Sequence, residues 1–124
     1  MPDMYGSRLF LYYNERSLEG TTKIDSGATI RDAVLSLTNY GICQETSWPY
    51  DISQFTLRPP TRCYKEANIH KVLSYKHIPQ DMHNIKNALN QGYPFAVGIR
   101  VFESFEYEYT FKSGFVPLPN PNNE

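Results

Sequence analysis

Two cysteines, Cys43 and Cys63, carry the side chains in this sequence best suited to nucleophilic chemistry. A catalytic cysteine must become a thiolate, and a helix N-terminus or a neighbouring imidazolium stabilises that charge. Cys43 follows the expected end of a helix, where the helix dipole disfavours negative charge. Cys63 lies beside Arg62 in a stretch that we expect to be irregular, and a nearby charge alone is weak support for catalysis. We therefore predict structural roles for both cysteines and no catalytic residue in this chain. Whether they are reduced or joined by a disulfide stays open.

The histidines and the carboxylates form no pattern that would hold a metal ion or perform acid–base chemistry. His70, His77 and His83 are spaced unlike zinc ligands, and no pair of carboxylates accompanies them. The other candidate acids are best interpreted as surface charges: Asp51, Glu103, Glu106 and Glu108. The sequence therefore predicts no metal site and no cofactor.

The clearest element is a helix over residues 30–40. Thr29 is a good N-cap for the amide of Asp32, and apolar residues recur at helical spacing from Ile30 to Leu37. Gly41 can adopt the left-handed conformation that ends a helix, which we expect to be a Schellman ending. After it, Trp48-Pro49-Tyr50 predicts an extended turn that anchors two large rings.

The remaining elements alternate between helices, loops and strands. Residues 7–16 favour a short helix or turn packed on the main helix, and Asp81 can cap a helix over about 82–91. The stretch from 52 to 68 is expected to be irregular, because Arg58-Pro59-Pro60 interrupts regular helix. Strands are expected over three segments: 71–78, 95–102 and 111–118. The Pro-rich tail at 119–124 is expected to stay unpacked.

Length and charge limit the classes of function. A chain of 124 residues has room for one domain or for part of a larger one. Its formal charge of −1 gives no electrostatic reason to expect nucleic acid or a membrane surface as partner. No run reaches the roughly 18 apolar residues of a membrane-spanning helix, and residues 1–6 do not resemble a signal peptide. The compartment and the oligomeric state stay open.

The order of motifs from Ser26 to Asp51 resembles the middle of papain-like cysteine peptidases. A small-Gly-small run precedes a helix, Tyr-Gly-Ile ends it, and an aromatic-Pro-Tyr-acid turn follows. In that family the small-Gly-small run forms a substrate-binding edge of the active-site cleft. The resemblance therefore implies that Ser26, Gly27 and Ala28 bind substrate. It also aligns Cys63 with a position that is a structural half-cystine in many members.

A second match, over the residues GYPFAVGIRV, corresponds to the first long strand of the β-rich right domain of that family. It implies that Gly98 lines the pocket for the second residue upstream of the scissile bond. The fold class implied is α+β: a partial papain-like fold with a helical left-domain portion over 1–70 and a β right-domain portion over 71–124. The partner implied is a peptide or protein substrate.

The resemblance covers only the segment between the catalytic elements of the family. There the nucleophilic cysteine and an oxyanion-stabilising glutamine precede this region, and the catalytic histidine and asparagine follow it. We therefore expect a cysteine-peptidase relative that is inactive as this isolated chain. A non-catalytic peptide-binding or interaction domain derived from the same fold is the alternative, followed by an unrelated small α+β protein.

The resemblance also makes one geometric prediction. Gly27 and Gly98 should face one shared groove although they are far apart in sequence. Gly27 would offer its backbone N–H and C=O to an extended peptide, as an added strand would require. Gly98 would leave space for a side chain of that peptide. Taken singly, Gly27 is better explained by a tight turn and Gly98 by a neighbouring core residue, and only their joint placement by the resemblance favours a groove.

Overall fold

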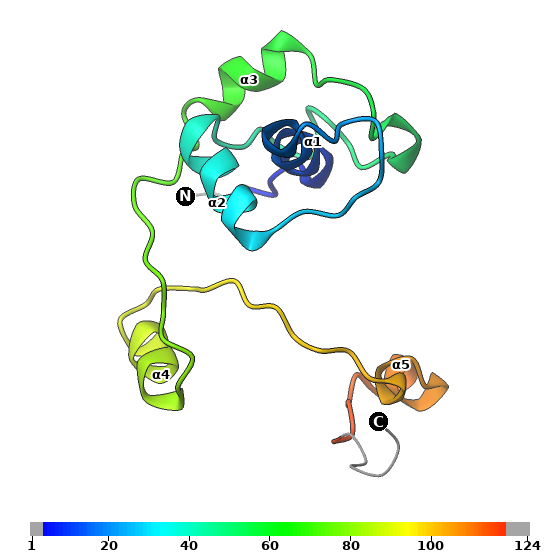
Figure 1. Cartoon of the computed structure of the whole chain (residues 1–124), viewed down its shortest axis with the longest axis vertical. Helices are drawn as coiled ribbons and strands as arrows, with labels where there is room; N and C mark the ends of the chain where they lie inside the picture. Colours follow the sequence, from blue (N-terminus) through cyan, green and yellow to red (C-terminus); the bar gives the residue numbers. More distant parts are fainter. Residues whose placement is uncertain (1–3, 119–124) are drawn as a thin grey trace.

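The structure is a computed structural model, and it describes residues 4–118 of the chain. It contains five α-helices and two short 3₁₀-helices within those residues: α1 (Arg8–Glu19), α2 (Ile30–Asn39), η1 (Ile52–Gln54), α3 (Thr61–Ala67), α4 (Met82–Asn90), η2 (Glu103–Phe105) and α5 (Glu108–Ser113). Figure 1 shows α1, α2 and α3 gathered into one compact part, from which the chain continues through α4 to α5 in extended segments. The predicted tail at 119–124 lies outside the described residues.

Helix α1 confirms the expected helix near the start of the chain and extends it to Glu19. The hydroxyl of Ser7 accepts a hydrogen bond from the Phe10 amide, which satisfies one of the free N–H groups of the first turn. Leu9 and Phe10, both on this helix, are fully buried. Helix α1 packs against α2, as the sequence predicted.

Helix α2 also matches the prediction. The Thr29 side chain accepts a hydrogen bond of 3.1 Å from the amide of Asp32. At the other end, Gly41 has a φ of 79°, and its amide donates to the carbonyl of Leu37. This single bond is the simpler left-handed cap and not the expected Schellman pair, because the amide of Ile42 bonds to His70 instead.

Helix α3 corrects the prediction that residues 52–68 are irregular. The two prolines do not prevent this helix, because they precede it: Pro60 is the residue at its N-cap, where no N–H is needed. Cys63 and Ala67 on α3 are fully buried, and they join Phe10 and Cys43 in a small core. Cys63 therefore belongs to a helix and not to an irregular loop.

The three expected strands are absent from residues 4–118, so the β part of the fold class is not confirmed. Residues 71–78 and 95–102 have no regular structure, and α5 takes in the start of the segment 111–118. The physical reason is a lack of partners, since a strand exists only when a neighbour accepts and donates its backbone hydrogen bonds. No amide from 95 to 102 donates a backbone hydrogen bond.

Helix α4 confirms the expected helix over about 82–91, with the Asp81 carboxylate accepting a hydrogen bond of 2.9 Å from the amide of Asn84. Figure 1 shows α4 and α5 at a distance from the compact part. Many of their apolar side chains are exposed, including Met82, Leu89 and Phe111. The core of the described chain is therefore the one formed by α1, α3 and the segment that carries Ile42, Cys43 and Trp48.

Candidate functional site

The predicted substrate edge, Ser26 to Ala28, lies in the loop between α1 and α2, immediately before the Thr29 cap. All three residues are exposed and outside regular secondary structure. Gly27 has a φ of 71°, and a Cβ placed there would meet no atom within 4 Å. The glycine is therefore required by the backbone conformation and not by a close neighbour.

The polar backbone groups of Gly27 both have hydrogen-bond partners within the chain. Its N–H donates a hydrogen bond of 3.1 Å to the Tyr12 hydroxyl oxygen, and its carbonyl accepts one of 3.1 Å from the Ser26 hydroxyl. Ala28, in contrast, makes no hydrogen bond with its N–H or C=O in the described chain. Ala28 is thus the residue of this edge with backbone groups available to an extended ligand.

The Tyr12 hydroxyl also donates a hydrogen bond to the Asp25 carboxylate. This bond raises the pKa of Tyr12 above its ordinary value, because ionising the phenol would remove the proton that it donates. Burial and the negative charge of Asp25 act in the same direction, whereas the Gly27 amide and Arg16 oppose them. The phenol is therefore protonated at neutral pH and can hold Asp25 and Gly27 together.

Gly98 lies in the unpaired segment between α4 and α5, where it is exposed, and a Cβ added to it would meet no atom within 4 Å. Figure 1 shows that this segment runs apart from the loop between α1 and α2. Two surface hollows of about 310 and 350 Å³ are lined by other residues. The groove shared by Gly27 and Gly98 is therefore not formed by contacts within this chain, and it stays a prediction.

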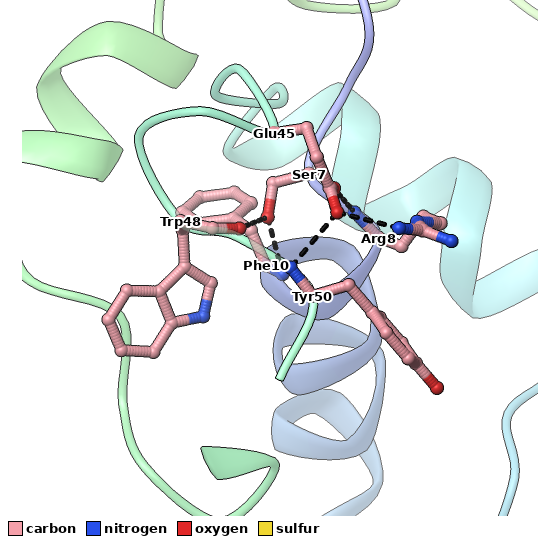
Figure 2. A network of polar contacts seen from close by, with 6 residues as sticks. All are labelled: Ser7, Arg8, Phe10, Glu45, Trp48 and Tyr50. Atoms are coloured by element: carbon pink, nitrogen blue, oxygen red, sulfur yellow. Dashed lines mark hydrogen bonds and ion pairs between the residues drawn. The ribbon is translucent and has the colours of Figure 1, made fainter. Parts of the chain in front are cut away.

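The turn at Trp48-Pro49-Tyr50 is fixed to the N-terminus of α1. The Ser7 hydroxyl donates a hydrogen bond of 2.6 Å to the Trp48 carbonyl, while it also caps α1 (Figure 2). Glu45 accepts hydrogen bonds from the amides of Arg8 and Tyr50 and forms an ion pair of 2.8 Å with the Arg8 guanidinium. These partners lower the pKa of Glu45. One serine and one glutamate thus hold the turn against α1.

The two cysteines are free thiols, and both are fully buried. Burial raises the pKa of Cys43 to about 12, and the neighbouring Cys63 thiol adds to the effect. The Cys63 thiol donates a weak hydrogen bond of 3.6 Å to the Ser47 carbonyl. A thiol with so high a pKa is almost entirely protonated at neutral pH, so Cys43 offers no nucleophile.

No group of three or more histidine, cysteine or carboxylate side chains suited to a metal ion occurs within residues 4–118. In the same range, no helix is both long and apolar enough to cross a membrane.

Two comparisons with known proteins bear on this arrangement. The chain is 40% identical over 121 residues to the "Uncharacterized peptidase C1-like protein L477" of Acanthamoeba polyphaga mimivirus, and the match covers 91% of this chain and 39% of that protein. The structure matches the crystal structure of xylellain, a cysteine protease from Xylella fastidiosa, with a TM-score of 0.81 and 35% identity, covering 98% of this chain and 50% of the other. No protein-family model matches the sequence.

Both matches are to papain-like, C1-like cysteine peptidases, and this chain resembles a part of each. It spans about half the length of xylellain and about two fifths of the length of the viral protein. The similarity to xylellain extends over nearly the whole chain, so the helical part and the extended segments both correspond to regions of that protease.

Sequence reasoning missed the residues that hold the edge in place. It singled out Ser26, Gly27 and Ala28 but not Tyr12, Arg16 or Asp25, which contact or flank that loop. The available signal was the spacing of Tyr12 and Arg16, which lie four residues apart and therefore on one face of a helix. That spacing alone does not say which loop the two side chains reach.

Proposed function

We propose that this chain is the central part of a papain-like cysteine peptidase that hydrolyses peptide bonds. The observation that carries the proposal is the match of 98% of the chain to a solved cysteine protease at a TM-score of 0.81. In such a peptidase a cysteine thiolate attacks the peptide carbonyl and forms an acyl-thioester, and a histidine acts as base and then as acid. The substrate would be a peptide or a protein.

In this proposal the chain contributes the substrate edge and not the catalytic groups. Cys43 and Cys63 are buried thiols, and within residues 4–118 neither is hydrogen-bonded to a histidine, so in this proposal another segment of the whole protein supplies the nucleophile. Ser26, Gly27 and Ala28 would line one side of the cleft. The exposed and unbonded backbone of Ala28 would pair with the extended substrate.

Gly98 would line the opposite side of the cleft once residues 95–102 pair with strands from the rest of the protein. Val97, Ile99 and Val101 alternate along this segment, and each is more than half exposed in this chain. Alternating apolar residues on an unpaired segment are typical of a strand whose neighbours are supplied by other residues. Residues 1–70 would then belong to the helical left domain and 71–124 to the β right domain.

Two experiments test the proposal. The coding DNA on both sides should contain, in frame, a Gln and a Cys upstream and a Gly-His pair downstream. The 124-residue chain by itself should not cleave peptide substrates. Hydrolysis that is lost in Cys43→Ser or in Cys63→Ser would overturn the assignment of the nucleophile to another segment.

The second candidate is a non-catalytic peptide-binding domain that keeps the cleft edge. The burial and high pKa of the Cys43 thiol agree with this candidate as well as with the first, because both require no nucleophile at this position. Flanking DNA that lacks the in-frame Gln, Cys and Gly-His codons would support this candidate against the peptidase.

A further inference from the structure

The most unusual buried group in this chain is the guanidinium of Arg16. Arg16 lies on α1 and is completely buried, although a buried cation is costly unless it is paired or fully hydrogen-bonded. It forms no salt bridge with any residue from 4 to 118. Its charge must therefore be balanced by dipoles.

Those dipoles are backbone carbonyls, and two of them belong to the loop before the substrate edge. The Nη1 atom donates to the carbonyls of Thr22 and Ile24, at 3.0 and 3.4 Å. The Nη2 atom donates to the Phe55 carbonyl at 2.6 Å. The Nε atom donates to the backbone carbonyl of Tyr12, one turn earlier on α1, at 3.2 Å. The N–H donors of a guanidinium are fixed in one plane, like the prongs of a fork. The hydrogen bonds of Arg16 therefore set the position of the loop relative to α1 and to Phe55.

Tyr12 continues the same contact toward the edge. Its ring lies 4.0 Å from the guanidinium carbon of Arg16, within the range of a cation–π interaction, and the Phe55 ring lies 5.1 Å away. The hydroxyl of Tyr12 then bonds to Asp25 and accepts the Gly27 N–H. Arg16, Tyr12 and Gly27 thus form a continuous chain of contacts from the buried face of α1 to the exposed loop.

We propose that Tyr12 and Arg16 are positioning residues that fix the Ser26-Gly27-Ala28 edge by holding the loop of residues 22–27 on α1. They leave the Ala28 backbone free and hold the Gly27 amide on the Tyr12 hydroxyl. This inference rests on the proposed function only where it calls Ser26-Gly27-Ala28 a peptide-binding edge. The contacts by which Tyr12 and Arg16 hold the loop do not depend on that function.

Amide hydrogen exchange of the full 124-residue chain tests the proposal. In Tyr12→Phe, which removes one oxygen atom, the Gly27 amide should exchange about fivefold faster, the effect of one ordinary hydrogen bond. In Arg16→Lys, which keeps the charge but loses the planar fork, it should exchange at least about tenfold faster. The Gly41 amide, bonded to Leu37 at the end of α2, is the internal reference and should change much less.

Two exposed residues outside this network supply matched controls. Arg62→Lys and Tyr75→Phe make the same chemical changes at exposed positions, and neither should alter the exchange of Gly27.

Three outcomes would overturn the proposal. The first is unchanged exchange of Gly27 in Tyr12→Phe. The second is an equal acceleration at Gly27 and Gly41, which would mean a general loss of stability. The third is full protection of Gly27 in Arg16→Lys, which would mean that charge alone suffices. If Arg16→Lys does not fold, Tyr12→Phe decides the matter. None of these results bears on whether the whole protein is a peptidase, which the flanking DNA decides.

Discussion

At the scale of single residues, two glycines with nearly the same backbone conformation have different surroundings. Gly27 and Gly41 have φ values of 71° and 79°. A Cβ at Gly27 would meet open space, whereas a Cβ at Gly41 would overlap the carbonyl oxygen of Ala67 on α3. Gly27 is needed only for its left-handed backbone conformation. Gly41 is needed for the same conformation and also because its backbone lies directly against the Ala67 carbonyl.

The stability of two alanine variants should separate these effects. Gly27→Ala should lower the free energy of unfolding by about 1–2 kcal/mol, the usual cost of a left-handed conformation with a side chain. Gly41→Ala should cost clearly more, about 3 kcal/mol or above, because the backbone of α3 must also move. Urea denaturation measures both values. Equal losses in the two variants would contradict the contact between Gly41 and α3.

The thiol of Cys43 provides a chemical prediction at the same scale. Its burial and its pKa of about 12 leave very little thiolate at pH 8. We expect iodoacetamide to modify Cys43 in the native chain more than about a hundredfold more slowly than in the urea-unfolded chain. Mass spectrometry of a quenched time course measures the two rates. Rapid modification of native Cys43 would show that this thiol is accessible and ionised, against the structural role assigned to it.

At the scale of elements, the loop before the substrate edge ends where α2 begins. The cap at Thr29 therefore connects the site to a regular element, through the bond from the Asp32 amide and a second contact between the Thr29 hydroxyl and the Asp32 carboxylate. A helix that frayed at this end would leave the position of Ala28, the residue before the cap, less fixed.

Thr29→Ala should cost about 1 kcal/mol in the free energy of unfolding, because the Asp32 amide loses its partner. Thr29→Ser keeps the hydroxyl and should retain most of that stability. Thermal or urea denaturation compares the two variants. A serine variant as unstable as the alanine variant would show that the methyl group of Thr29, and not its hydroxyl, stabilises this end of α2.

A second element-scale prediction concerns pH. The pKa of Glu45 is lowered in the folded chain by its bonds to Arg8 and Tyr50. Its stabilising effect is therefore complete above its unfolded pKa of about 4.3 and is lost as the pH falls through the lower folded value. Glu45→Gln should be less stable than the natural chain at pH 7, by less than about 1 kcal/mol because the pair is near the surface, and should lose less stability between pH 5 and pH 3.

Urea denaturation at several pH values measures this difference. Asp51, Glu66 and Asp81 also have lowered pKa values, so some acid sensitivity should remain in the variant. A variant whose stability falls with pH as steeply as that of the natural chain would exclude Glu45 as a contributor.

At the scale of the whole molecule, the compact helical part and the extended segments differ in how their backbone groups are satisfied. The helices, caps and turns of the first part pair their amides with one another. The amides of residues 95–102 donate no backbone hydrogen bond, and Val97, Ile99 and Val101 in this segment are exposed. Such a segment provides a template for a neighbouring strand.

The amides of residues 95–102 should therefore exchange in the isolated chain at nearly the rates of an unfolded peptide, while the amides of α1 and α2 are protected. Residue-resolved hydrogen exchange by NMR measures both. Addition of the rest of the peptidase as a separate polypeptide should protect the segment if the proposed strand pairing occurs. Protection in the isolated chain would mean that it already pairs, for example with a second copy.

The sequence by itself determined the local elements whose causes are local. The caps at Thr29 and Asp81 and the stop at Gly41 depend on neighbouring residues, so α2 and α4 could be predicted with correct positions. The order of motifs around Ser26 and Gly98 also sufficed to indicate the peptidase family. The sequence does not predict α3, because the two consecutive prolines interrupt regular helix, whereas in the structure they precede the helix and Pro60 is its N-cap.

Tertiary structure alone decided which groups are free and which are occupied. The three expected strands are absent from residues 4–118, because strand formation depends on partners distant in sequence. A periodic pattern does not reveal whether those partners are present. The Gly27 amide is bonded because Tyr12, fifteen residues earlier, reaches it across a loop that Arg16 fixes. Contacts between residues so far apart follow from the packing of α1 against that loop, and no spacing rule along the chain contains them.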